Sequence, residues 1–336
     1  MTAIWVTPST VRGEFLVTDL GGGIAYGINA SGQVVGQNAV GHAFLYGNGT
    51  ATDLGTLGGS SSFALGINDS GQVVGWADSV GNTTHGFLYS NGSMTNLSPS
   101  SLTGGAQGIN ANGQVVGWYS NSSTATQPFL YTNGVENNLG TFPVGSNTYP
   151  LSINGNGQVV GYTYQTGITG DQPFLVSNGT TQIFGLSGGF QMINASGQEV
   201  GGHYLSDTVW HALLNSNGTM TDLGTLGGSN SWAYGINTAG QIVGDAYTPS
   251  GAEHAFLYSN GTMTDLNRLI DPLSGWTLES AMAINDKGQI VGWGTNASGQ
   301  SDAFLLSPIP EPSSVMLAAL GFIGLLVCGW RRRNRS

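Results

Sequence analysis

The chain has 336 residues, of which 56 are glycine and only 7% are charged, and its formal net charge is −11. Disordered chains combine low hydrophobicity with high charge, so a hydrophobic content of 39% with few charges excludes that class. Residues 1–310 contain three basic residues against seventeen acidic ones, a balance that would repel a phosphate backbone and makes nucleic acid an unexpected partner.

Residues 1–13 form an N-terminal lead before the first repeated element. An export signal combines a basic start with an apolar run of about 7–15 residues. The opening MTAIWVTPSTVRGEFLV has neither, because Thr7, Pro8, Ser9 and Thr10 interrupt its apolar residues. We therefore expect an export signal to lie upstream of Met1.

The body of the chain is built from a repeated motif, Ile-Asn-x-x-Gly-Gln-x-Val-Gly. It recurs at intervals of 39 to 48 residues, which is close to the period of about 40–50 that is typical of propeller blades. The motif begins at Ile28, Ile67, Ile109, Ile153, Ile193, Ile236 and Ile284.

Each repeat predicts four short strands: one that runs into Ile-Asn, then GQVVGW, then AFLY, then MTDL. The first connection is a tight turn in which the Asn bonds its own backbone and Gly takes a positive φ. The third connection is an Asn-Gly pair, the preferred two-residue type I′ hairpin turn. These pairs begin at Asn48, Asn91, Asn133, Asn178, Asn217 and Asn260.

The two ends of the body complement each other. Phe15–Gly23 (FLVTDLGGG) reads as a fourth strand with no strands before it, and Asp302–Leu306 (DAFLL) reads as a third strand with none after it. One unit assembled from both termini closes a circular array and protects its strand edges. We predict an all-β fold, a seven-bladed β-propeller of four-stranded blades over residues 14–307, closed by the N-terminal strand.

The third strand of several repeats carries a recurring His-Ala-Phe. It stands at His42-Ala43-Phe44 and His254-Ala255-Phe256, with variants that begin at His85 and His211. In these residues the body resembles the HAF repeat family, and the resemblance implies an extracellular repeat protein without implying a reaction. The equivalent position in different blades lies around a ring, so we expect these histidines to bond within their own blade, and we expect no metal or cofactor.

Four aromatic residues follow the second strand at one repeat position: Trp76, Trp118, Tyr162 and Trp293. The matching positions hold Gln37, Gly202 and Asp245. Two interpretations stay open. The rings pack between blades, or they stack on sugar rings at the strand ends, which makes them ligand-binding candidates.

Glu199 departs from the repeat, because the other six units have an apolar residue in its place. His203 lies four residues later and on the same strand face. The pair could act as acid and base or as two metal ligands, or Glu199 could be a solvated variation at a blade edge. The enzymatic alternative is a secreted hydrolase or lyase that acts on glycans through Glu199 and His203. No second carboxylate completes a glycosidase-like pair.

The last segment, residues 308–336, differs from everything before it. The apolar run Val315–Trp330 includes the single cysteine, Cys328, and predicts a transmembrane helix over residues 315–330. Arg331, Arg332 and Arg333 follow at once, and the positive-inside bias places them in the cytoplasm. A cytoplasmic, tail-anchored protein is the alternative, and it would need these arginines to cross the membrane.

Pro310-Glu311-Pro312, the apolar run and the arginine cluster together resemble a PEP-CTERM sorting tail. The resemblance implies cleavage near Pro310–Pro312 by an exosortase-type enzyme. We therefore expect a precursor anchored in the inner membrane and a processed protein at the cell surface or in the extracellular matrix. The expected function is non-enzymatic binding of extracellular polysaccharide or of a surface protein.

Overall fold

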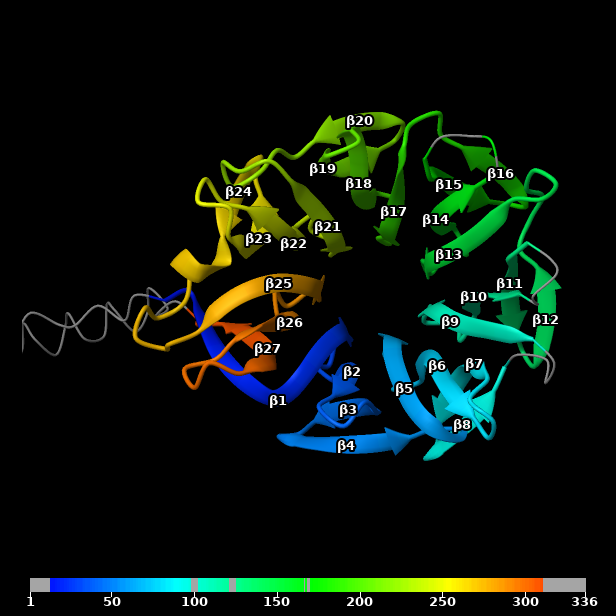
Figure 1. Cartoon of the computed structure of the whole chain (residues 1–336), viewed down its shortest axis with the longest axis horizontal. Coiled ribbons are helices and arrows are strands. Elements are labelled where there is room, and N and C mark those ends of the chain that lie inside the picture. The colour runs from blue at the N-terminus through cyan, green and yellow to red at the C-terminus, as the bar shows by residue number, and fades with distance from the viewer. Residues whose placement is uncertain (1–12, 98–101, 121–124, 166, 168–169, 311–336) are drawn as a thin grey trace, which may run out of the picture.

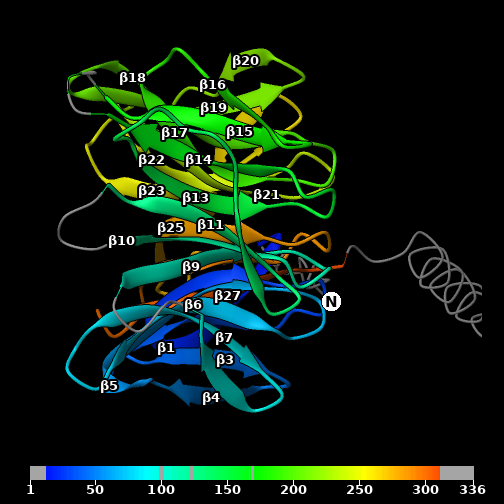
Figure 2. The ribbon, with the colours of Figure 1, turned by 90° about the vertical axis from the view of Figure 1, so that its right-hand side faces the viewer.

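The computed structural model describes residues 13–97, 102–120, 125–165, 167 and 170–310. In this part of the chain all regular structure is β apart from one 3-10 turn, η1 (Leu266–Arg268), which confirms the all-β prediction. The strands form separate sheets that stand in a ring, each with its first strand nearest the centre (Figure 1). Seen edge-on, the strands run across the thickness of the ring, and the connections gather on its two faces (Figure 2).

Five of the sheets have four antiparallel strands each, in chain order from the centre outward. The first contains β5 (Gly58–Ile67), β6 (Val73–Ser79), β7 (Thr84–Ser90) and β8 (Ser93–Asn96), and the second contains β9 (Thr103–Ile109), β10 (Val115–Ser120), β11 (Gln127–Thr132) and β12 (Val135–Asn138). The third contains β13 (Asn147–Ile153), β14 (Val159–Tyr164), β15 (Gln172–Ser177) and β16 (Thr180–Ile183). The fourth contains β17 (Gly188–Ile193), β18 (Glu199–Ser206), β19 (Val209–Ser216) and β20 (Thr219–Asp222), and the fifth contains β21 (Ser231–Ile236), β22 (Ile242–Tyr247), β23 (Glu253–Ser259) and β24 (Thr262–Asp265).

The two ends of the ring meet in a seven-stranded sheet, in which the long strand β1 serves two four-stranded units. The first part of β1, from Phe15 to Gly22, pairs with β27, and the second part, from Gly23 to Ile28, pairs with β2. The N-terminal strand therefore closes the ring against the last strand of the body. The seven strands are β25 (Thr277–Ile284), β26 (Ile290–Thr295), β27 (Ser301–Pro308), β1 (Phe15–Ile28), β2 (Val34–Asn38), β3 (Ala43–Gly47) and β4 (Thr50–Gly55).

The hairpins have the predicted turns. Asn48 and Gly49 have φ values of 50° and 79°, as a type I′ turn requires, and the other five Asn-Gly pairs repeat this pattern. A second glycine is fixed by packing, because a β-carbon on Gly75 in β6 would lie 1.8 Å from the carbonyl oxygen of Phe63 in β5. The glycine of the repeated Val-Gly step is thus required by the close approach of the two inner strands.

The asparagine of the repeated motif joins neighbouring sheets. Asn29 Oδ1 accepts from the backbone N–H groups of Ser31 and Gln33, while its Nδ2 donates to Gln33 Oε1 at 2.8 Å. The same Nδ2 donates to the carbonyl of Asn68, in the next turn around the ring, at 3.1 Å. Each of the seven asparagines does this, and Asn285 donates back to the carbonyl of Asn29 at 3.0 Å. These seven hydrogen bonds, here called the asparagine ring, form a closed circle.

The hydrophobic core lies between neighbouring sheets. In one of its clusters, Val200 of β18 and Ala212 of β19 pack with Ala233 of β21 and Phe256 of β23. Such a cluster stabilises the contact between two sheets, because each one buries its apolar face against the next. The core therefore fixes the sheets in position but leaves their ends, on the two faces of the ring, available for a site.

Candidate functional site

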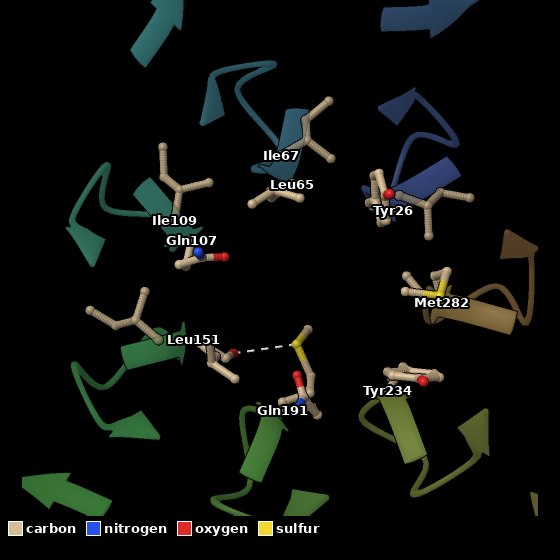
Figure 3. Close-up of a pocket in the computed structure, with 18 of the residues that line it drawn as sticks. Tyr26, Leu65, Ile67, Gln107, Ile109, Leu151, Gln191, Tyr234 and Met282 are labelled. Carbon is tan, nitrogen blue, oxygen red and sulfur yellow. Dashed lines mark hydrogen bonds between the residues drawn. The ribbon is translucent and has the colours of Figure 1, made fainter. Parts of the chain in front are cut away.

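A narrow cavity lies on the axis of the ring (Figure 3). Each innermost strand has a one-residue register shift close to its repeated Ile-Asn, typical of a β-bulge, and a bulge re-aims the side chain of its extra residue. In all seven inner strands that side chain lines a cavity of about 220 Å³. The seven residues are Tyr26, Leu65, Gln107, Leu151, Gln191, Tyr234 and Met282.

The candidate aromatic residues lie near the other end of the inner strands, half-buried at the borders between sheets. Trp76 stacks on Phe63, its cross-strand partner, with ring centroids 3.9 Å apart. Tyr162 stacks in the same way on Tyr149, at 5.2 Å. Burial, with the nearby Asp171, raises the pKa of Tyr162 to about 12, so its hydroxyl remains a hydrogen-bond donor.

Contacts between sheets connect these aromatic pairs. Trp76 Cδ1 and Trp118 Nε1 lie 3.6 and 3.4 Å from the place that a β-carbon on Gly105 would occupy. Trp118 meets Tyr149 edge-on, with centroids 5.5 Å apart. The absence of a side chain at Gly105 therefore allows the rings of three neighbouring sheets to approach one another.

The series continues into two more sheets. Tyr204, 41% exposed, lies 6.2 Å from Trp232 and 6.3 Å from Trp210, measured between ring centroids. Tyr204 is also close enough to Tyr162 to contribute to its raised pKa. We call this series the aromatic arc: Phe63, Trp76, Trp118, Tyr149, Tyr162, Tyr164, Tyr204, Trp210 and Trp232.

Of the four predicted aromatic candidates, three lie in the arc and Trp293 does not. Trp293 pairs with Ser280 and Ala303 inside its own sheet, and no ring contact within the described residues connects it to the arc. Six arc members were missed by the sequence analysis. Three of the six could have been found from the sequence, since Phe63, Tyr149 and Trp232 occupy one position on the inner strand, opposite the position of the candidates.

The repeat position of Trp76, Trp118 and Tyr162 holds Asp245 in the fifth sheet, and the charge of Glu253 acts on it. Asp245 is buried and accepts a hydrogen bond from Ser280 Oγ at 3.2 Å. Burial, then the charge of Glu253, raises the pKa of Asp245 to about 7. Burial, then Glu279, raises the pKa of Glu253 as well. Asp245 therefore ionises less readily than an ordinary aspartate, a feature that the sequence analysis missed.

Glu199 is buried rather than solvated at an edge, with 3% of its surface exposed. Burial raises its pKa to about 7, and its cross-strand partner is Asn215. His203 pairs with His211 farther along β18, about 13 Å away at the rise of an extended strand. The structure therefore does not bring Glu199 and His203 into one site.

Three of the four recurring histidines bond within their own sheets, whereas Nδ1 of His85 is buried without a hydrogen-bond partner among the described residues. Nδ1 of His42 lies 2.9 Å from Asp53, and the same contact joins His211 to Asp222 and His254 to Asp265 at 2.8 Å. Each pair links the third strand to the fourth. In the described part of the chain, no group of three or more His, Cys, Asp or Glu side chains is arranged to hold a metal ion.

The predicted sorting residues lie at the edge of what the structure describes. Pro310 is exposed just after β27, whereas Glu311, Pro312, Arg331, Arg332 and Arg333 and the predicted transmembrane helix 315–330 lie outside the described residues. In the part of the chain that is described, no helix meets the length and hydropathy of a membrane span.

Comparison with known proteins supports the tail and the fold. Residues 308–333 match the PEP-CTERM protein-sorting motif, which implies an exported protein that an exosortase processes at the membrane. A comparison with curated proteins found no match for the chain.

Several solved structures resemble the body. The β-propeller domain of the Trilobed protease from Pyrococcus furiosus has a TM-score of 0.56 at 8% identity, over 87% of this chain and 93% of that one. A puromycin-hydrolyzing peptidase of Mycobacterium tuberculosis has a TM-score of 0.54 at 12% identity, over 90% of this chain and 54% of that one. TolB from Acinetobacter baumannii covers 86% of this chain and 65% of its own, at 13% identity. Its TM-score of 0.46 indicates a weaker structural likeness.

At these identities the likeness shows the fold alone: several four-stranded sheets arranged as in β-propellers. The chain spans only 54% of the peptidase and 65% of TolB. The activities of those proteins are therefore not carried over to this one.

Proposed function

We propose that this protein is a non-enzymatic, polysaccharide-binding seven-bladed β-propeller of the HAF repeat type. Its precursor is anchored in the inner membrane, and the processed protein acts at the cell surface or in the extracellular matrix. The observation that carries the proposed binding function is the aromatic arc, a series of rings that crosses five sheets, most of them partly buried and two, Tyr164 and Tyr204, exposed.

The arc suits an extended chain of sugars. Sugar rings present apolar C–H faces, and aromatic rings offer an apolar face with a polar edge. One sugar stacked on one ring is held weakly, but a chain that contacts several rings in succession gains from each further contact without a new association step. Because the body carries an excess of acidic residues, the ligand we expect is a neutral polysaccharide rather than a polyanion.

The blade count rests on the asparagine ring and on β1. Seven asparagines in seven repeats form one closed circle of hydrogen bonds, and β1 supplies a strand to each of two units. Each unit then has four strands, as the repeat predicts. This support is independent of the arc, so the seven-bladed architecture does not depend on the proposed ligand.

The enzymatic alternative lacks a suitable pair of groups. Glu199 and His203 are four residues apart on one extended strand, about 13 Å at its rise per residue. Glycosidases hold their two carboxyl groups about 5–9.5 Å apart, because a sugar or a water must fit between them. The separation of Glu199 and His203 exceeds this range, so we retain the non-enzymatic function.

A fluorescence titration tests the proposal. The purified protein is titrated with the extracellular polysaccharide of its own bacterium, and we expect a saturable change in tryptophan emission. Trp118→Ala, in the middle of the arc, should weaken binding at least tenfold, whereas Trp293→Ala, which lies outside the arc, should leave it unchanged. Binding that is indifferent to Trp118→Ala would contradict the proposal, and so would the release of new reducing ends during incubation.

A further inference from the structure

The fourth sheet has a polar cross-strand pair that the other units lack. Glu199 of β18 lies opposite Asn215 of β19. The equivalent pairs are apolar or aromatic: Val34 with Tyr46, Val73 with Tyr89, Val115 with Tyr131, Val159 with Val176, Ile242 with Tyr258, and Ile290 with Leu306. Two neighbouring positions have thus become polar together in a single unit, which is unexpected for a packing position.

Both side chains are buried, and each has an acceptor without a partner. Glu199 and Asn215 are each 3% exposed. Glu199 Oε2 and Asn215 Oδ1 have no hydrogen-bond partner among the described residues. Buried acceptors that remain unpaired are rare and destabilising, so these two oxygens call for a group that donates to both.

The two side chains line a cavity of about 190 Å³ between the third and fourth sheets. The space is more than ten times the roughly 10–15 Å³ that a single water needs. Leu175 and Phe184 of the third sheet give it an apolar wall, and the amides of Gln158 and Gln182 add donors and acceptors. The cavity lies at the start of β18, so it opens at the opposite end of that strand from Tyr204 of the arc.

We propose that this junction cavity, formed by Glu199, Asn215, Gln158, Gln182, Leu175 and Phe184, binds a single neutral pyranose residue. A pyranose supplies hydroxyl donors for the two unpaired oxygens, hydroxyl acceptors for the amides, and a C–H face for the apolar wall. An anion is disfavoured by the buried carboxyl group. A simple cation would leave the apolar wall without a contact.

The junction cavity goes beyond the proposed polysaccharide binding, because it is a separate site of different size on the other face of the ring. The arc binds a chain through many weak stacking contacts, whereas the cavity has room for one sugar unit. A substitution in one site can therefore abolish binding there and leave binding at the other site unchanged.

The test uses the whole protein and four simple probes: methyl glucoside, methyl mannoside, methyl galactoside and methyl N-acetylglucosaminide. Binding of each is measured by saturation-transfer NMR, followed by titration of any glycoside that gives a signal. The decisive variant is Glu199→Val with Asn215→Tyr, because it restores the pair that three other units carry. Gln182→Trp, at an exposed position on the outer strand β16, covers the cavity without altering its floor and serves if the double variant fails to fold.

We expect at least one glycoside to bind, and both variants to weaken it at least tenfold while circular dichroism stays unchanged. Trp118→Ala should bind the glycoside as the wild type does, even where it loses the polysaccharide. The proposal is overturned if none of the four glycosides binds, or if binding survives Gln182→Trp. Loss of the glycoside in Trp118→Ala alone would assign the sugar to the arc and would also overturn it.

Discussion

Glu199 makes the stability of the protein depend on pH. Its pKa is about 7 in the folded state, against an ordinary value of 4.5. Below pH 4.5 the Glu199 carboxyl is protonated in both the folded and the unfolded state. Between pH 4.5 and 7 it ionises only in the unfolded state, so the free energy of unfolding falls as the pH rises. The loss should be about 3 kcal/mol by pH 8, since one pKa unit corresponds to about 1.4 kcal/mol.

Glu199→Gln removes this contribution. Urea denaturation at pH 5 and pH 8 should show a smaller loss of stability in the variant than in the wild type. Glu14→Gln, an exposed acid, is the matched control and should behave as the wild type does. An equal pH dependence in Glu199→Gln and wild type would mean that the carboxyl group is solvated in the folded protein.

Asn110 connects two neighbouring repeats through the asparagine ring. It is 4% exposed, and its Nδ2 donates to Gln114 and to the carbonyl of Asn154. Asn110→Ala leaves these acceptors unpaired and should cost about 1–3 kcal/mol in the free energy of unfolding. Asn112→Ala, in the same turn but exposed, should cost about 0.5 kcal/mol or less. Equal costs in chemical denaturation would show that the ring contributes nothing.

Gly75 tests the packing of the inner strands. Its replacement by Ala would force a β-carbon to within 1.8 Å of the Phe63 carbonyl oxygen, so the two strands would have to separate. We expect a loss above about 3 kcal/mol or a failure to fold. Gly49→Ala is the control, because it adds a methyl group in open space at a positive φ and should cost only about 1–2 kcal/mol. Thermal unfolding of both variants compares them, and a mild effect of Gly75→Ala would contradict the tight pairing.

The repeat motif predicts most of the strands and turns because residues that are close in the sequence specify them. Asn48-Gly49 specifies its turn whatever surrounds it, and the motif that contains Asn29 and Gln33 satisfies its own backbone. The register shifts that send Tyr234 and its equivalents into the axial cavity were not predicted. A register shift depends on how two strands pair, and no single residue type marks it.

The candidate sites, too, were predicted where neighbouring residues specify them and missed where contacts between strands or sheets do. Trp76, Trp118 and Tyr162 could be selected because they share one repeat position, but their contacts with one another cross sheets and depend on Gly105 and Tyr149. Sequence spacing says nothing about such contacts. The pairing of Glu199 with His203 failed for a related reason, because residues on one face of an extended strand can still lie far apart.

The ring as a whole depends on the first part of β1. A chain that begins at Gly23 keeps all repeats but loses the pairing of Phe15 and its neighbours with β27, which would leave that strand with a free edge. We expect calorimetry to show a melting temperature lower by roughly 10 °C or more. A chain that begins at Glu14 is the control and should melt as the full chain does. Equal melting of the two shortened chains would mean that the ring does not need this closure.

The central claim is that the aromatic arc binds one polysaccharide chain along several blades. Calorimetry with oligosaccharides of increasing length, cut from the host's own extracellular polysaccharide, tests it most directly. The arc predicts an affinity that rises at least tenfold from the shortest to the longest fragments, and a rise that disappears in Trp118→Ala. An affinity that does not change with length, or a rise that survives Trp118→Ala, would contradict it.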